Sequence, residues 1–348
     1  MGEKIKEAWT GPGRKDGKIT VLKPKDDALH IDINKRGSAE WWYFDARLDN
    51  GYTVVAFFRA RHERTGKTGV EITVYRPNGE KTLNVYDYAR SDFSISPDKA
   101  DVRIGKNYIK ADCSNEKLWK YEIFLDEGEY GMHLKYTGTV HAWMPGSGYT
   151  EFENKGHFGW CVALPRADVE GTIKVNNETI PAKGIGYHDH NWLNFNFARY
   201  LDFWYWGRIF SENFTMLFVY IKCNKQMDNH EIKVLMLAKG EKVYLSTGEC
   251  DLIQENFEYN ENAGNSYPKS LKFVLPDQQE ITLNVQEIID ADSLLDDFNP
   301  ILRFLAKYLL RLTPGYFRLN SKFNLNLTYE GKKYEEDGTT LHEMVIVK

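Results

Sequence analysis

The sequence is poor in cysteine and proline. Of 348 residues, only 4 are cysteine and 11 are proline. The cysteines (Cys113, Cys161, Cys223 and Cys250) are widely spaced and form no CxxC pair, which argues against a disulfide framework or a zinc ribbon. Low proline combined with 42% hydrophobic residues excludes a disordered chain.

Long apolar runs and blocks of basic residues are also missing. No stretch reaches the roughly 18 apolar residues that span a bilayer, and residues 1–18 lack the apolar core of a secretory signal. The net charge is −5, with both signs mixed along the chain, so we expect no nucleic-acid partner. We therefore expect a cytoplasmic protein.

Aromatic residues, by contrast, are abundant: 21 Tyr, 19 Phe and 9 Trp. Many lie in short β-branched and aromatic runs, such as Lys81–Tyr88 and Phe214–Cys223, which are separated by turn sequences such as Pro77-Asn78-Gly79. This pattern predicts an all-β protein made of antiparallel barrels or sandwiches.

An internal repeat suggests two halves. The segment Glu40–Phe44 (EWWYF) matches Asp202–Trp206 (DFWYW) with a shift of 162 residues, and the shift continues without a gap to the next apolar run. Each half would suit a single barrel. We expect an N-terminal domain over residues 20–185 and a C-terminal domain over residues 186–348.

One segment breaks the β pattern. Residues 293–312 have helical spacing, and Arg303, Lys307 and Arg311 form a basic stripe on an otherwise apolar helix. We expect a helix across a barrel mouth with its stripe in water. The alternative is that residues 299–312 form a helix that rests on a membrane surface, which would make the protein membrane-associated.

The segment Gly184–Trp192 (GIGYHDHNW) is the best candidate for a site. If it is extended, Tyr187, Asp189 and Asn191 share one face, and His188 and His190 share the other. Such a density of polar groups is costly to bury unless each is used or satisfied. Three interpretations remain open: a hydrogen-bonded polar plug, a metal site, and an acid–base site centred on Asp189.

The metal interpretation rests on the His-x-His pair, to which His157 or Glu40 would add a third ligand. One such pair is a weak signal, so we predict no metal and no other cofactor. Arg208 is a natural partner for the carboxylate of Glu40 or Asp202.

The runs GIGYHDHNW, EWWY and WYWGR together resemble the carotenoid 1,2-hydratase/AttH-like (hydroxyneurosporene synthase-like) superfamily, from about residue 30 to the end. That family has two lipocalin-like barrels packed together, which agrees with the repeat. It includes carotenoid hydratases, kievitone hydratase, and fungal proteins that promote intramolecular Diels–Alder cyclisation.

The resemblance implies roles for particular residues. In the carotenoid hydratases a Tyr-x-Asp pair carries the proposed proton donor, and Tyr187 and Asp189 match it. A His and a Trp upstream, separated there by one residue, also matter. Here His157 and Trp160 are separated by two, a departure that affects their roles and the inferred carotenoid substrate.

An acid role for Asp189 also has a physical basis. An ordinary Asp, with a pKa of about 3.9, is protonated in only about one molecule per thousand at pH 7, and apolar burial raises that pKa. Aromatic faces stabilise a carbocation. We expect a substrate-binding set around the acid: Glu40, Trp41, Trp42, Trp160, His188, His190, Trp192, Trp204, Trp206 and Arg208.

The sequence thus predicts an enzyme that acts on a small apolar isoprenoid or polyene by acid-initiated hydration or cyclisation, with Asp189 as the acid and Tyr187 and His157 as its catalytic companions. The alternatives are a protein that binds a hydrophobic ligand unchanged and a pericyclase-like catalyst that acts by shape. The oligomeric state stays open.

Overall fold

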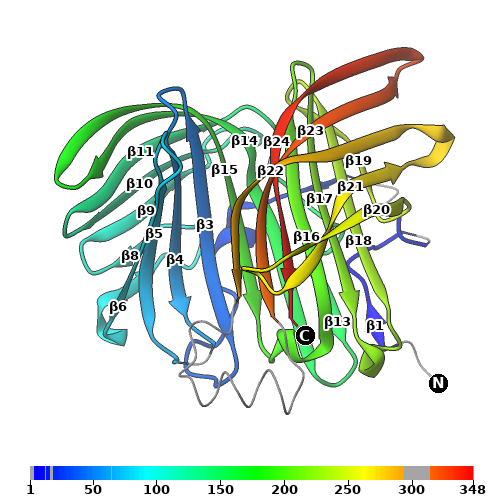
Figure 1. Cartoon of the computed structure of the whole chain (residues 1–348). Coiled ribbons are helices and arrows are strands. Elements are labelled where there is room, and N and C mark those ends of the chain that lie inside the picture. Colours follow the sequence, from blue (N-terminus) through cyan, green and yellow to red (C-terminus); the bar gives the residue numbers. More distant parts are fainter. Residues whose placement is uncertain (1–3, 12, 16–18, 64, 294–313, 348) are drawn as a thin grey trace. The chain divides into compact units, whose positions relative to one another are not determined.

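The computed structural model describes residues 4–11, 13–15, 19–63, 65–293 and 314–347, which form mostly antiparallel strands (Figure 1). The chain divides into two compact units. The N-terminal unit comprises Lys18–Asn196 and Gly240–Val243, and the C-terminal unit comprises Met1–Gly17, Phe197–Lys239 and Tyr244–Lys348. The division expected at residues 185/186 falls inside a strand of the N-terminal unit, β15 (Glu178–Leu193).

The N-terminal unit has one long curled sheet. Its order is β6 (Lys81–Tyr88), β5 (Thr68–Tyr75), β4 (Thr53–Arg61), β3 (Ala39–Leu48), β15, β14 (Gly156–Val175), β11 (Tyr130–Gly138), β10 (Lys120–Glu127), β9 (Asn107–Asp112), β8 (Val102–Ile104) and β7 (Phe93–Ile95). Three short strands extend it near β14: β2 (Thr20–Val21), β12 (Trp143–Met144) and β13 (Tyr149–Phe152).

The C-terminal unit has a second curled sheet, in the order β19 (Lys242–Thr247), β18 (Glu231–Lys239), β17 (Phe214–Cys223), β16 (Leu201–Phe210), β24 (Lys332–Ile346), β23 (Gly315–Tyr329), β22 (Glu280–Ser293), β21 (Asn265–Val274) and β20 (Asp251–Asn260). The two-residue β1 (Ile5–Lys6) precedes them in the chain. One sheet curls into a near-barrel and the other into a half-barrel, so the all-β prediction is confirmed.

Alternation of side chains explains these strands. Along β11, Met132, Leu134 and Tyr136 are buried, whereas His133 and Lys135 are exposed. An antiparallel sheet with one face on a core and one in water produces this period of two. The strands predicted at Lys81–Tyr88 and Phe214–Cys223 are confirmed with the same bounds, as β6 and β17.

The helices of the described residues are short 3₁₀ turns: η1 (Pro24–Asp27), η2 (Arg90–Asp92), η3 (Phe197–Tyr200), η4 (Lys225–Met227) and η5 (Pro276–Gln278). The single long helix that we expected is not part of this described fold. It falls on residues 294–313, which lie outside the described residues, as does its basic stripe. Within the described ranges, no helix is long and apolar enough to cross a membrane.

The repeat is confirmed in the order of the strands. From β6 to β9 and from β19 to β20, the two sheets run through nine corresponding positions, in which β3 matches β16, β4 matches β17 and β15 matches β24. Each half therefore folds by the same plan.

In β16, however, the structure assigns residues to the two faces of the strand differently from the sequence alignment. In the N-terminal unit, Trp42 pairs with Phe58. The counterpart of Phe58 at a shift of 162 is Tyr220 (220 − 58), and Tyr220 pairs with Tyr205. Trp42 thus corresponds to Tyr205 (205 − 42 = 163), and Trp204 points away from the core. A slip of one residue exchanges the two faces of a strand, and β16 carries aromatic side chains on both.

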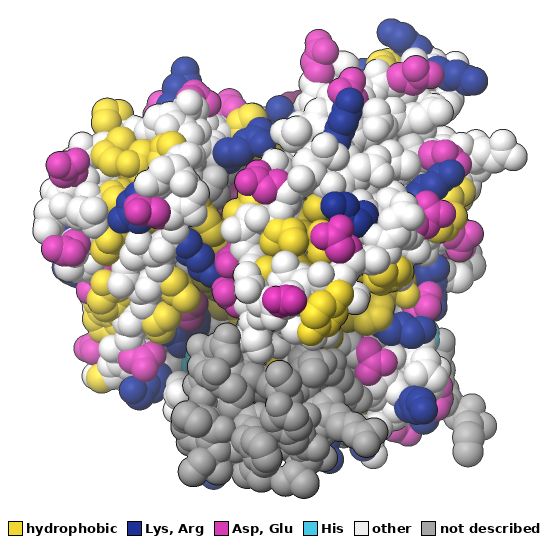
Figure 2. Space-filling view, in the orientation of Figure 1, with side chains coloured by type: hydrophobic (Ala, Val, Ile, Leu, Met, Phe, Trp, Pro, Cys, Tyr) yellow, Lys and Arg dark blue, Asp and Glu magenta, His cyan; other side chains and the backbone are white. Residues whose placement is uncertain are grey.

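Charge is mixed on the surface as it is along the sequence. In Figure 2, Lys and Arg side chains are interspersed with Asp and Glu on the visible face of both units.

Candidate active site

Strand β15 carries the candidate segment between β3 and β14, where close backbone contact is required. A Cβ at Gly184 would lie 2.1 Å from the Arg47 carbonyl oxygen, and one at Gly186 would lie 2.6 Å from that of Asp45. Only glycine allows this approach, as the sequence suggested. The strand has a core face, which packs with Trp42, Phe44 and the other residues of the N-terminal core, and an opposite face.

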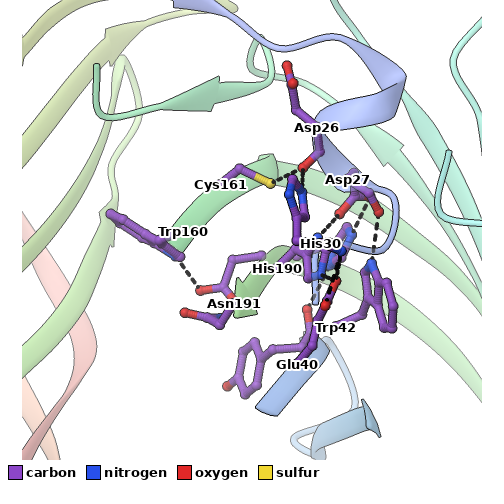
Figure 3. Close-up of polar contacts among 12 residues, drawn as sticks. Asp26, Asp27, His30, Glu40, Trp42, Trp160, Cys161, His190 and Asn191 are labelled. Atoms are coloured by element: carbon purple, nitrogen blue, oxygen red, sulfur yellow. Dashed lines mark hydrogen bonds and ion pairs between the residues drawn. The ribbon is translucent and has the colours of Figure 1, made fainter. Parts of the chain in front are cut away.

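On the opposite face, three side chains converge on Asp189. Its Oδ2 accepts hydrogen bonds from Trp160 Nε1 at 2.9 Å and from the Tyr187 hydroxyl at 2.8 Å. Its Oδ1 accepts one from Asn191 Nδ2 at 2.8 Å. Tyr187, Asp189 and Asn191 therefore share a face, as their spacing predicted. Trp160 reaches this face from β14, and Figure 3 labels Trp160 and Asn191 there.

Burial decides the protonation of Asp189. The side chain is only 5% exposed, and burial raises its pKa from 3.8 to about 6, although the bonds from Trp160 and Tyr187 and the charge of His188 act in the opposite direction. At pH 7, about one molecule in ten then carries a protonated Asp189, against about one in a thousand for an ordinary Asp. This carboxyl group can act as an acid near neutral pH.

On the core face, the two histidines meet a carboxylate that the sequence did not indicate. His188 Nε2 lies 3.2 Å from Asp27 Oδ2, and His190 Nδ1 lies 3.2 Å from Asp27 Oδ1. The Tyr121 hydroxyl donates to Asp27 Oδ2 at 2.6 Å, and Trp42 Nε1 donates to the Asp27 carbonyl oxygen at 3.0 Å. Turn η1 thus carries Asp27 into the interior of the unit.

Glu40 closes this core-face network. Its carboxylate lies 2.9 Å from His190 Nε2 and accepts backbone N–H bonds from His30 and Ile31, each at 2.8 Å. Glu40 is fully buried, and these partners lie within the N-terminal unit. Its carboxylate charge is therefore compensated without Arg208. The ring of Trp42 stacks on His190 with centroids 4.4 Å apart.

The network holds a buried cation between two acids. Burial alone would lower the pKa of His190, but Asp27 and Glu40 raise it to about 9. Burial alone would raise the pKa of Asp27, but His188 and His190 hold it well below its usual range. Both ring nitrogens of His190 face carboxylate oxygens, as an imidazolium requires.

The same cluster contains the atoms best placed to hold a metal ion. Atoms of Asp27, Cys161 and His190 lie within 4.8 Å of one another, and all three residues are buried. This set shares only His190 with the predicted one, which was His188 and His190 with His157 or Glu40. An imidazolium between carboxylates accounts for the arrangement without a metal, and burial raises the pKa of the Cys161 thiol well above its usual value.

His157 lies at the start of β14, away from the hydrogen bonds to Asp189. Its backbone N–H donates to Asn194 Oδ1 at 2.9 Å, its Nδ1 lies 3.2 Å from Asn194 Nδ2, and its ring meets that of Tyr149 edge-on at 5.2 Å. Burial lowers the pKa of the half-buried imidazole, and the charge of Lys35 adds to this effect.

The predicted tryptophans divide between the faces. Trp42 and Trp192 are on the core face, where Trp192 stacks on His30 with centroids 3.7 Å apart. Trp41 is half-buried and pairs across the strands with Asn191, on the face of Asp189. Trp160 alone of the four donates a hydrogen bond to Asp189.

Three predicted residues belong to the C-terminal unit. Trp204 and Trp206 are half-buried on β16, on the face away from Tyr205 and the core. Arg208 shares that face and lies 5.6 Å from the ring centroid of Trp206.

Two buried acids near the site were missed by sequence reasoning. Asp27 lies in the polar segment Lys23–Asp27, where nothing local indicates burial. Asp45 is 1% exposed and accepts a hydrogen bond from the Tyr43 hydroxyl at 2.8 Å. The second residue had a signal in the sequence, because Tyr43-x-Asp45 repeats the spacing of Tyr187-x-Asp189.

A recess of about 780 Å³ lies elsewhere in the N-terminal unit, along β7–β11. No predicted site residue lines it. It shares Tyr121, the donor to Asp27, with the core-face network. Its lining mixes charged side chains of both signs with apolar ones, so the recess does not select an apolar ligand.

These features define the class: a doubled, lipocalin-like β protein with a buried carboxylic acid on one strand of its N-terminal unit. Residues 16–300 match the AttH-like family model. The chain belongs to the AttH-like family.

Individual relatives are distant. A hydroxyneurosporene dehydrogenase of Chlorobaculum tepidum is 22% identical over 261 residues, covering 64% of this chain and 67% of the relative. An AttH protein of Nitrosomonas europaea has a similar structure, with a TM-score of 0.63, 15% identity and coverage of 97% of this chain and 98% of the other. The kievitone hydratase of Nectria haematococca also has a similar structure, with a TM-score of 0.56, 15% identity and coverage of 96% and 98%.

Proposed function

We propose that the protein is an enzyme that protonates an alkene of an apolar isoprenoid or polyene, with Asp189 as the acid and water addition or ring closure as the outcome. The observation that carries the proposal is the buried Asp189, whose pKa is raised to about 6 in an aromatic setting. The names of two relatives, a hydratase and a hydroxyneurosporene dehydrogenase, point to the same kind of substrate.

The mechanism follows from the contacts of Asp189. A protonated Asp189 donates to one alkene carbon, and a carbocation forms at the other. The hydrogen bonds from Trp160, Tyr187 and Asn191 then stabilise the carboxylate that remains, so they matter more after proton transfer than before it. Water captures the cation, or a second double bond of the same substrate does.

The test uses neurosporene and a panel of prenylated phenols, dispersed in detergent and incubated with the protein in H₂¹⁸O. Hydration adds one labelled oxygen, and cyclisation changes retention without changing mass. Asp189→Asn should lower turnover by about 100-fold or more, because general-acid catalysis contributes 10²–10⁴-fold.

Asp168→Asn is the matched control, since this exposed carboxylate lies on β14 of the same sheet and should leave turnover unchanged. Full turnover by Asp189→Asn would exclude Asp189 as the acid. An alkene that binds to the wild-type protein and is recovered unaltered would favour the binding function instead, and cyclisation that survives Asp189→Asn would favour catalysis by shape.

A further inference from the structure

The face of Asp189 carries a second Tyr-x-Asp pair on the neighbouring strand. Asp189 lies directly across from Tyr43, and Tyr187 lies directly across from Asp45. Directly opposed residues of antiparallel strands point to the same side of the sheet. The four side chains therefore form a square, with the tyrosines on one diagonal and the aspartates on the other.

The contacts within the square are paired. The Tyr187 hydroxyl donates to Asp189 Oδ2 and the Tyr43 hydroxyl donates to Asp45 Oδ2, each at 2.8 Å. The two phenol rings meet edge-on, with centroids 6.2 Å apart. Both carboxyl groups are buried, at 5% exposure for Asp189 and 1% for Asp45.

Addition of water needs a second group that the acid cannot supply. After Asp189 has given its proton to carbon, the attacking water must lose a proton as its oxygen bonds to the cation. The Cα atoms of diagonal neighbours across antiparallel strands lie about 7–8 Å apart, so Asp45 and Asp189 are close neighbours on the same face of the sheet.

We propose that Asp45 is the general base that takes this proton from water, an inference that rests on the proposed function of Asp189. Atoms and electrons balance in this step. The Asp189 O–H proton and the π electrons of the alkene form the new C–H bond. Water then forms the C–O bond, and its proton passes to Asp45. Asp45 then releases its proton to solvent water and Asp189 takes one up, so the cycle needs no other reactant.

The test separates protonation from water capture. In D₂O, a cation that is not captured loses a proton to the Asp189 carboxylate and regenerates an alkene that carries deuterium. With neurosporene in detergent as the probe, Asp45→Asn should lower hydration by about 100-fold while deuterium incorporation stays within about threefold of wild type. Asp189→Asn should abolish both reactions, and Asp168→Asn should change neither.

A second variant covers the case in which Asp45→Asn does not fold. Tyr43→Phe removes only the hydroxyl that bonds to Asp45, and it should lower hydration more than deuterium incorporation. Equal losses of the two reactions, or no loss of either, would overturn the role of Asp45 alone. A wild-type protein that neither hydrates nor exchanges the probe, or an Asp189→Asn variant that does both, would overturn the proposed function and this inference with it.

Discussion

Two adjacent buried residues of β15, Asp189 and His190, differ in the charges that surround them. Asp189 is buried among hydrogen-bond donors, so its pKa rises to about 6 and a substantial minority of molecules carry its proton near neutral pH. His190 is buried between two carboxylates, so its pKa rises to about 9 and it holds a charge. The first residue is suited to chemistry and the second to structure.

Trp160→Phe tests what sets the pKa of Asp189. The variant removes the indole N–H, which favours the charged form of Asp189, so the pKa should rise above about 6. The fall in kcat/KM at high pH should move to higher pH by about one unit, and ¹³C NMR of the Asp189 carboxyl carbon should show the same shift. A shift toward lower pH would show that loss of the ring opens the site to water instead.

Asp27→Asn tests the core-face network. It leaves the His190 imidazolium with one carboxylate, which should lower the free energy of unfolding at pH 7 by about 3 kcal/mol or more. Because the pKa of His190 is higher in the folded state, its contribution is full below the unfolded value of about 6.5 and is lost as pH rises through about 9.

The cost of Asp27→Asn should therefore shrink in urea melts above pH 9. Asp126→Asn, which weakens only partly exposed ion pairs with Lys106 and Lys174, should cost less than about 1 kcal/mol at every pH. A constant cost for Asp27→Asn across the range would contradict a charged His190.

At the scale of elements, the packing of β14 against β15 requires glycine at position 159. Gly159 lies directly across from Trp192, and a Cβ on Gly159 would lie 1.9 Å from the Trp192 ring. The ring covers the bare backbone of the glycine, as aromatic residues do across from strand glycines, and it also stacks on His30.

Gly159→Ala should consequently displace Trp192 and lower the free energy of unfolding by about 1–3 kcal/mol, measured by urea denaturation. Adding Trp192→Phe, which has a smaller ring, should recover part of the loss, so the two changes together should cost less than the sum of each alone. An additive pair would contradict a direct contact.

How much of these elements the sequence predicts depends on how local the cause is. Runs of β-branched and aromatic residues between turn sequences predicted β6 and β17, and the period of two predicted the shared face of Tyr187 and Asp189, because neither signal requires knowledge of neighbouring strands. The sequence did not reveal that Asp27 reaches His190, since a contact across 163 positions (190 − 27) depends on how η1 packs. It also did not reveal that His190 and the backbone N–H groups of His30 and Ile31 contact Glu40.

At the scale of the whole molecule, the C-terminal unit has a counterpart of Asp189. Asp189 pairs with Tyr43. At the structural shift of 163 residues, Tyr43 corresponds to Trp206 (206 − 43), and Trp206 pairs with Glu343. Glu343 differs in its partners: Tyr316 donates to its carboxylate at 2.8 Å, and Arg318 pairs with it at 3.1 Å. Glu343 is thus held in an ion pair with an arginine, whereas Asp189 accepts its hydrogen bonds from Trp160, Tyr187 and Asn191.

Opposite effects should follow from matched changes in the two units. Glu343→Gln removes the ion pair between Glu343 and Arg318, so it should lower the melting temperature while turnover per folded molecule stays within about threefold of wild type. Asp189→Asn should keep the melting temperature and lose turnover. Thermal melts and alkene turnover on the same preparations measure both, and loss of turnover in both variants would show that each unit contributes an acid.

The two faces of β15 imply that selection can act on them separately. Under the proposed function, positions 187, 189 and 191 would set the reaction, whereas the contacts of positions 188, 190 and 192 on the core face would stabilise the fold. A saturation mutagenesis library scored for abundance and for turnover should give two interleaved profiles along this strand. A lineage that holds the even positions fixed is free to explore new chemistry at the odd ones.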